Sequence, residues 1–174
     1  MRRWHGVVSA AAAACLAPAL GGPAASAASP APQPGSSCPA ELSGAMTLLP
    51  DRSEFLVCQG SWSPADVPFP PNDKWLSVGP AMTLHGEGMR NPNLRSGQWT
   101  ATPRDPATTC AAEQLTIVRA GVLAPPQDWR GVPGQPLSVQ VLPRLFSIEL
   151  SGDCLWSRDD AAGGIKDAHA PDRP

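Results

Sequence analysis

The stretch Leu137–Ser157, which reads LSVQVLPRLFSIELSGDCLWS, decides the fold class of this chain. Apolar and polar side chains alternate in two successive segments, which are separated by the turn residues Pro143-Arg144. The apolar side chains that share a face are Leu137, Val139 and Val141 in the first segment and Phe146, Ile148 and Leu150 in the second. This period of two predicts half-buried antiparallel strands. A tight turn at Ser151–Asp153 then leads into a third strand at Cys154–Ser157.

Short strand patterns continue through the rest of the chain, and 22 prolines make a helix-rich fold improbable, because proline removes a backbone donor and fixes φ. The further expected strands are Ala45–Leu49, Glu54–Cys58, Lys74–Val78, Ala81–His85, Gln98–Thr102 and Glu113–Arg119, the last with Leu115 and Ile117 on one face. Several short strands separated by turn residues predict an all-β fold, a small antiparallel sandwich or barrel.

The first 27 residues have the order of a secretory signal peptide: a basic head, the uncharged run Gly6–Leu20, and the small residues Ala25–Ala27. The run is too short for a relaxed transmembrane helix. Lipid anchoring at Cys15 is disfavoured, because Ala12 stands where a lipobox normally has leucine. We therefore expect a secreted or envelope-located protein with no transmembrane segment in its mature chain.

The mature chain divides by composition. Residues 28–37 form a proline- and serine-rich leader that is expected to be disordered, and residues 38–158 form a single β domain. A division of this domain into two related β units, 38–93 and 94–158, is an alternative, because glycine, tryptophan and a hydroxyl residue recur in that order around Trp62, Trp99 and Trp156. Residues 159–174 are polar without periodicity and are expected to form a disordered tail.

Four cysteines remain after removal of the signal peptide: Cys38, Cys58, Cys110 and Cys154. An even number of cysteines in an exported chain predicts disulfides, and four cysteines allow three pairings. Cys38–Cys58 with Cys110–Cys154 is favoured, because each pair then lies within one half of the chain. No metal site is expected, since no two cysteines have C-x-x-C spacing.

Charge and motifs exclude several function classes. Of the 13 Lys and Arg residues, Arg2 and Arg3 belong to the signal peptide, which leaves 11 basic against 15 acidic side chains and no basic patch. A nucleic-acid partner is therefore not expected. Neither a glycine-rich phosphate loop nor an EF-hand pattern is present, so no cofactor is expected.

Two functional hypotheses follow from single residues. Trp62, Trp75 and Trp129 lie in or near proline-rich loops, where exposed indoles could bind an envelope or extracellular ligand without catalysis. Packing beneath those loops is the alternative use of the same side chains. The second hypothesis is an exported hydrolase in which His85 acts as a base with a nearby carboxylate such as Glu87.

Part of the second half carries a pattern found in known proteins. The matching positions are Ser96–Thr100, Cys110, Leu115–Val118, Val132–Gly134, Val139–Val141, Phe146 and Gly152–Trp156. Over Leu94–Arg158 the chain resembles a family of small exported actinobacterial domains of unknown function. The resemblance implies a Cys110–Cys154 disulfide, export or lipid anchoring, and no catalytic site. The chain departs from the family pattern at Ala111-Ala112, where an aromatic residue often follows the first cysteine.

Overall fold

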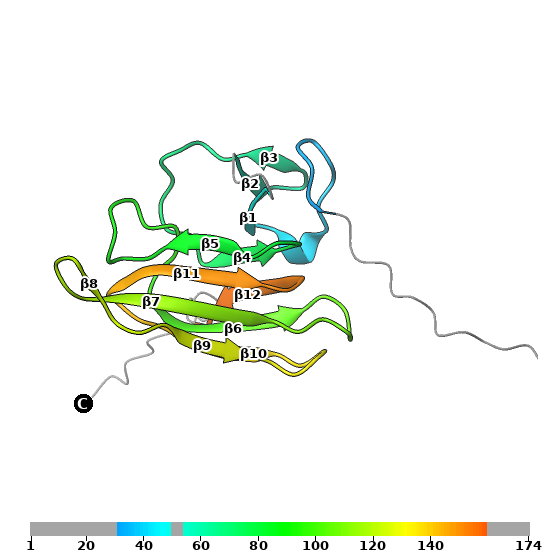
Figure 1. The fold of residues 1–174 in the computed structure, drawn as a ribbon. Coiled ribbons are helices and arrows are strands. Elements are labelled where there is room, and N and C mark those ends of the chain that lie inside the picture. The colour runs from blue at the N-terminus through cyan, green and yellow to red at the C-terminus, as the bar shows by residue number, and fades with distance from the viewer. Residues whose placement is uncertain (1–30, 50–53, 160–174) are drawn as a thin grey trace, which may run out of the picture.

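The computed structural model describes residues 31–49 and 54–159, and these residues form a β-sandwich of two sheets (Figure 1). The strands of the larger sheet lie in the order β10 (Leu137–Val141), β6 (Gly97–Pro103), β12 (Cys154–Arg158), β4 (Lys74–Ser77), β1 (Met46–Leu48), β2 (Phe55–Cys58) and β3 (Trp62–Pro64). The smaller sheet has the order β5 (Met82–His85), β11 (Leu145–Ser151), β7 (Ala111–Arg119) and β8 (Val122–Leu123), and β9 (Gln127–Arg130) also pairs with β7. The expected all-β fold is confirmed, and of the two alternatives the structure is a sandwich of two sheets and not a barrel.

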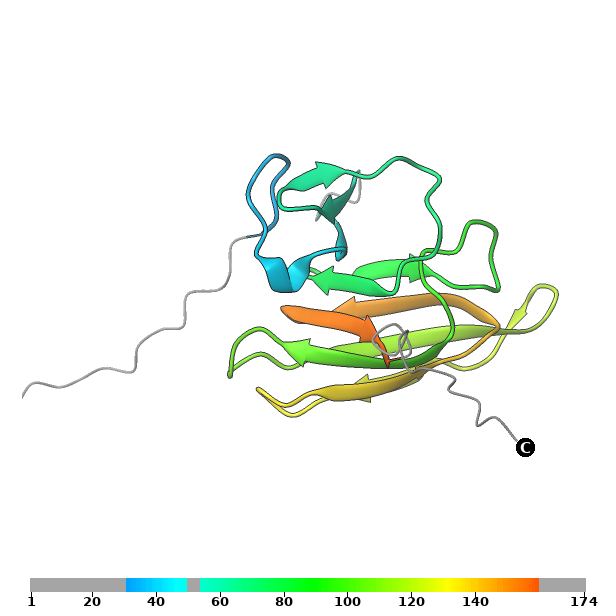
Figure 2. The same cartoon turned by 180° about the vertical axis from the view of Figure 1, so that it is seen from behind.

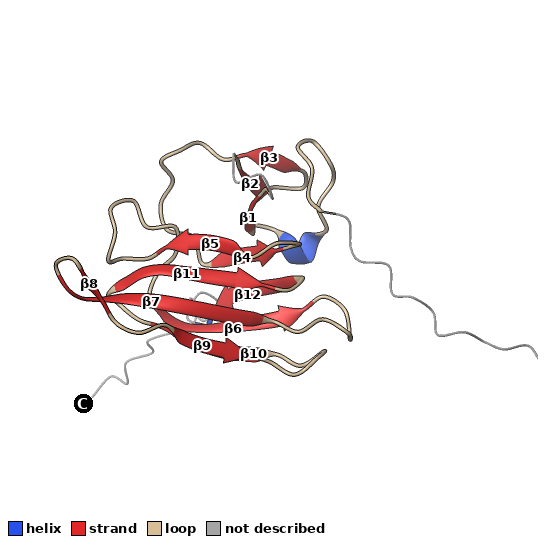
Figure 3. Cartoon of the chain, viewed as in Figure 1, coloured by secondary structure: helices blue, strands red, loops and turns tan. Residues whose placement is uncertain are grey.

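The two sheets lie one behind the other. In Figure 1 the layer of β5, β11, β7 and β9 faces the viewer, and Figure 2 shows β4, β12, β6 and β10 from the opposite side. The strands β1–β3 stand beside these layers, joined to β4 by the parallel pairing of Met46 with Trp75. The described residues contain one short helix, the 3-10 helix η1 (Ala40–Leu42), so nearly all regular structure is strand (Figure 3). None of the described residues forms a helix long and apolar enough to span a bilayer.

The main core lies between the two layers and is rich in tryptophan. Trp75, Trp99 and Trp156 are its largest fully buried side chains. Cys154 on β12 is bonded to Cys110, which directly precedes β7, with 6.0 Å between their Cα atoms. This disulfide therefore connects the two sheets, and the expected pairing is confirmed.

A second, smaller core lies under β1–β3. It contains the Cys38–Cys58 disulfide, also as expected, together with Leu42, Leu56 and Leu76. Adjacent residues of β4 point to opposite faces of the sheet, so Trp75 enters the main core while Leu76 enters the small one. Burial on both faces explains why this strand is continuously apolar over Trp75-Leu76 instead of alternating.

Strands from the two halves of the chain share both sheets. β4 pairs with β12, and β5 pairs with β11. The recurrence of glycine before tryptophan has a backbone cause, because Gly60, Gly97 and Gly152 all have positive φ at the entry to a strand that buries a tryptophan. The segments 38–93 and 94–158 are thus interleaved rather than arranged as two separate bodies.

Residues 31–37, the described part of the expected leader, pair with β3 through two backbone hydrogen bonds. The amide of Gly35 donates to the Trp62 carbonyl at 2.7 Å, and the amide of Trp62 donates to the Ser36 carbonyl at 2.8 Å. The segment therefore covers the outer edge of β3 over this length. The expected signal peptide at 1–27, including Cys15, and the tail beyond Asp159 lie outside the described residues.

On one strand the apolar pair is not the buried pair, and on another the expected face differs in the structure. On β7 the buried side chains are Ala112 and Gln114, while Leu115 and Ile117 are half-buried. On β11 a register shift between Leu145 and Ser147 makes Phe146 an extra residue, so Leu145 enters the core and Phe146 is left half-exposed. Ile148 and Leu150 point inward as expected, and so do Val139 and Val141 on β10.

Candidate functional site

The three tryptophans singled out from the sequence do not form an exposed surface. Trp62 and Trp75 are 3% and 0% exposed, because they fill the small and the main core respectively. Trp129 lies on β9 directly opposite the buried Ala112, so its half-buried indole points to the inner side and packs against the main core. Packing, the alternative use of these residues, is what the structure shows for Trp62 and Trp75.

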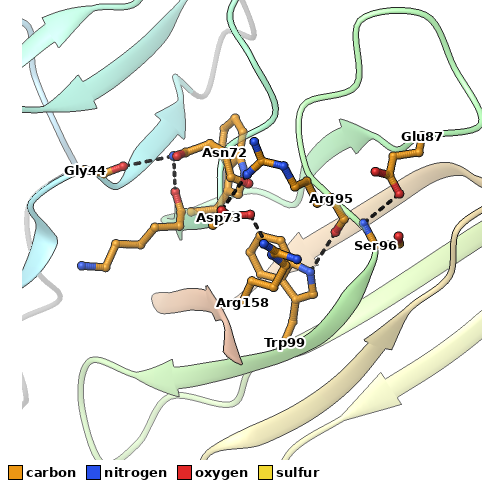
Figure 4. A network of polar contacts seen from close by, with 10 residues as sticks. Gly44, Asn72, Asp73, Glu87, Arg95, Ser96, Trp99 and Arg158 are labelled. Atoms are coloured by element: carbon orange, nitrogen blue, oxygen red, sulfur yellow. Dashed lines mark hydrogen bonds and ion pairs between the residues drawn. The ribbon is translucent and has the colours of Figure 1, made fainter. Parts of the chain in front are cut away.

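His85 and Glu87 are not joined to each other. His85 ends β5 with an exposed side chain whose ring lies edge-on to Phe146, 6.5 Å between centroids. The Glu87 carboxylate accepts a hydrogen bond from the Ser96 amide at 3.1 Å (Figure 4). The structure thus gives Glu87 the role of closing the β5–β6 loop, and no hydrogen bond connects it to the imidazole.

A polar network holds the base of the same loop (Figure 4). Asp73 accepts hydrogen bonds from Arg95 at 2.6 Å and from Arg158 at 2.8 Å, and the indole of Trp99 donates to the Arg95 carbonyl at 3.0 Å. The side-chain amide of Asn72 donates to the Gly44 and Lys74 carbonyls. These bonds join the β1 side of the molecule to β4, β6 and β12, so the network has a structural role.

An apolar groove opens at the far end of the smaller sheet. Its volume is about 330 Å³. We call it the hairpin groove and define it by the side chains Met89, Ile117, Arg119, Val122, Leu123 and Phe146. Met89 comes from the β5–β6 loop, Phe146 is the extra residue of β11, and the others belong to the β7–β8 hairpin. Three separate chain segments therefore build one surface.

The sequence explains why these segments converge. Gly121 has a φ of 73°, which allows the tight turn between β7 and β8. The Gly88 amide donates to the Leu145 carbonyl at 2.8 Å, and a Cβ on Gly88 would lie 2.6 Å from that oxygen. Only glycine allows the loop so close to β11. The Arg144 carbonyl accepts from the Ile117 amide at 2.8 Å and fixes the hairpin to the start of β11.

The outer face of the same sheet carries an acidic row at its opposite end. Glu113 on β7 lies directly between Asp128 on β9 and Glu149 on β11. The pKa of Glu113 is raised, first by desolvation and then by the negative charges of Asp128 and Glu149. Thr83 donates to Glu149 at 3.2 Å. Within residues 31–49 and 54–159, no group of His, Cys, Asp or Glu side chains is placed to hold a metal ion.

Comparison with known proteins adds no assignment: no family model matches the chain, and no similar curated protein or solved structure is found. The site must therefore be argued from this chain's own residues.

Sequence reasoning missed the hairpin groove for two reasons. The expected strand Glu113–Arg119 ends just before the turn residues Ala120-Gly121, although Val122-Leu123 directly after them could have indicated a short returning strand. The exposure of Phe146 depends on a bulge that the alternating pattern of β11 does not reveal.

Proposed function

We propose that this protein is an exported, disulfide-bonded, non-catalytic β domain that binds an envelope or extracellular partner through the hairpin groove rather than through tryptophans. The supporting observation is the distribution of exposed apolar side chains. Of the six large hydrophobic residues exposed among the described residues, four lie at this end of the sandwich: Met89, Val118, Val122 and Leu123. A concentrated apolar patch on an otherwise well-packed domain is typical of a binding surface.

The extracytoplasmic location has separate support. The two disulfides favour an oxidising, extracytoplasmic compartment, because disulfides are rare where thiols are kept reduced. Secretion itself is proposed from the signal-peptide pattern of residues 1–27. Membership of the exported actinobacterial family is part of the same proposal, and the Cys110–Cys154 bond agrees with what that resemblance implies.

The hydrolase alternative has no comparable support. An activated histidine needs a partner that orients or charges its ring. The exposed imidazole of His85 has an aromatic contact with Phe146 and no hydrogen bond to another described residue, and the nearby Glu87 carboxylate is bonded to a backbone amide. We therefore propose binding as the function.

Binding of a neutral apolar fluorophore, N-phenyl-1-naphthylamine, to the oxidised protein tests this proposal. The variant Leu123→Asp places a charge in the groove and should weaken binding roughly ten-fold or more, because the probe would desolvate a carboxylate. Val132→Asp is the matched control, since Val132 is 64% exposed in the β9–β10 loop at the other end of β7. Equal binding by both variants would remove the groove as the contact surface.

A further inference from the structure

We infer that the partner of the hairpin groove is the surface of an anionic lipid bilayer, an inference that rests on the proposed function and specifies its ligand. The β7–β8 hairpin extends beyond the two layers of the sandwich, as Figures 1 and 2 both show. The exposed fractions of Val118, Val122 and Leu123 are 52%, 38% and 40%, and that of Met89 in the neighbouring loop is 37%. An apolar projection of this kind can enter the boundary between headgroups and acyl chains, which is about 5–10 Å deep for interfacial segments.

The groove is accompanied by basic side chains. Arg119 lines the groove and lies opposite Val122, Arg90 directly follows Met89, and Arg144 donates to the Val118 carbonyl at 2.6 Å. All three arginines are exposed, and no ion pair joins any of them to another described residue. These three arginines outnumber the exposed Glu87 of the β5–β6 loop, so this end is locally positive in a chain whose formal net charge is −2. Arginines beside exposed apolar side chains complement anionic headgroups above an apolar interior.

The opposite end of β7 has the reverse charge. Glu113, between Asp128 and Glu149, lies six residues before Arg119, which corresponds to about 20 Å along a strand. An anionic surface attracts the arginine end and repels the acidic row. The charge pattern thus orients the domain with its hairpin toward the bilayer.

A bilayer explains the exposed residues better than a small soluble ligand does. A ligand seated in the groove would cover Ile117 and Leu123 but would leave Val118, which does not line the groove, in water. Insertion of the hairpin tip buries both sides of the hairpin together. The long arginine side chains can then extend from the apolar boundary to the headgroups.

The test is flotation of the exported, oxidised protein with lipid vesicles. One set of vesicles contains phosphatidylcholine alone, and the other contains phosphatidylcholine and phosphatidylglycerol in equal parts. We expect binding to the anionic vesicles only, and weaker binding as salt is raised. Leu123→Asp should abolish vesicle binding, and Arg90→Gln and Arg119→Gln should each weaken it about five-fold at low salt.

Two matched controls occupy the acidic end of the domain. Val132→Asp and Arg130→Gln change an exposed valine and an exposed arginine there, and both should retain vesicle binding. Circular dichroism and the absence of free thiols verify that each variant is folded. If the wild type binds N-phenyl-1-naphthylamine in the groove but not anionic vesicles, the lipid inference fails and the proposed function stands. If it binds neither, both fail; vesicle binding that Leu123→Asp leaves unchanged overturns the lipid inference alone.

Discussion

Replacement of Ser77 by alanine tests the hydrogen bonds that join β4 to β12 and to the turn before Cys154. The hydroxyl of Ser77 on β4 is fully buried and donates to the Gly152 carbonyl at 2.7 Å. The same oxygen accepts a hydrogen bond from the indole nitrogen of Trp156 on β12 at 2.9 Å. A single hydroxyl therefore joins the turn before Cys154 to a tryptophan of the core.

The expected cost follows from the two bonds. Ser77→Ala leaves the buried indole N–H of Trp156 without an acceptor, which costs about 1–3 kcal/mol. Loss of the bond to Gly152 adds about 1 kcal/mol. The free energy of unfolding should fall by about 3 kcal/mol, a large part of the stability of a domain of this size. Ser157→Ala, on the same strand pair but half-exposed, should change it by less than about 0.5 kcal/mol.

Urea unfolding of the oxidised protein, followed by circular dichroism, measures both variants, with an unchanged m-value as the condition for comparison. A double-mutant cycle then tests the mechanism. In a Trp156→Phe background no indole N–H is present, so the same Ser77→Ala change should cost about 1–2 kcal/mol less. Equal costs in the two backgrounds would refute the assignment of the penalty to the stranded indole.

Three further predictions concern other parts of the fold. Replacing Cys38 and Cys58 together by serine should destabilise β1–β3 by about 3 kcal/mol, because the disulfide closes a loop with a sequence separation of 20. Amide hydrogen exchange should become faster in β1–β3 while the main core stays protected. Uniform loss of protection would contradict this. Gln114→Leu should lower the free energy of unfolding in urea by about 1–3 kcal/mol, because the buried side-chain amide donates to the Gln140 carbonyl and accepts from the Leu142 amide at the end of β10. A decrease below about 0.5 kcal/mol would contradict this prediction. The pKa of Glu113 is raised in the folded state, so its contribution to stability is present below the unfolded pKa of 4.5 and is lost as pH rises through the folded pKa. Glu113→Gln should therefore be more stable than wild type at pH 7, and its unfolding free energy should depend less on pH above 4.5. Parallel pH profiles of the two proteins would exclude this.

Periodicity predicted the strands that have one buried and one exposed face. β10 alternates over Leu137–Val141, and its inward residues Val139 and Val141 are buried as the pattern requires. The division of the chain into halves also led to the disulfide pairing, and the Cys38–Cys58 bond fits the antiparallel pairing of β1 with β2. Local patterns were sufficient for β10 and for Cys38–Cys58, which depend on residues close in sequence, whereas Cys110–Cys154 joins the two sheets across a separation of 44.

The failures arise where contacts between distant segments determine the structure. β9 is only four residues long and follows two prolines, so its alternation is too short to recognise, and it forms because Gln127–Arg130 pairs with β7. The exposure of the loop tryptophans was not predictable from neighbouring prolines either. Trp75 is buried because it projects from β4 into the core between the two sheets, where side chains of β5 and β11 cover it, and no local sequence pattern reveals this packing.

The misread face of β11 and the proposed binding surface have the same origin. The extra residue at Phe146 turns one large aromatic side chain out of the core, where a regular strand would bury it. The neighbouring Leu145 takes the buried position, and glycines at 86 and 88 allow the β5–β6 loop to pack against it. The loop then brings Met89 to the β7–β8 hairpin. A regular β11 would bury Phe146 and leave the groove without its aromatic wall, so this departure from the local rule is what forms the proposed binding surface.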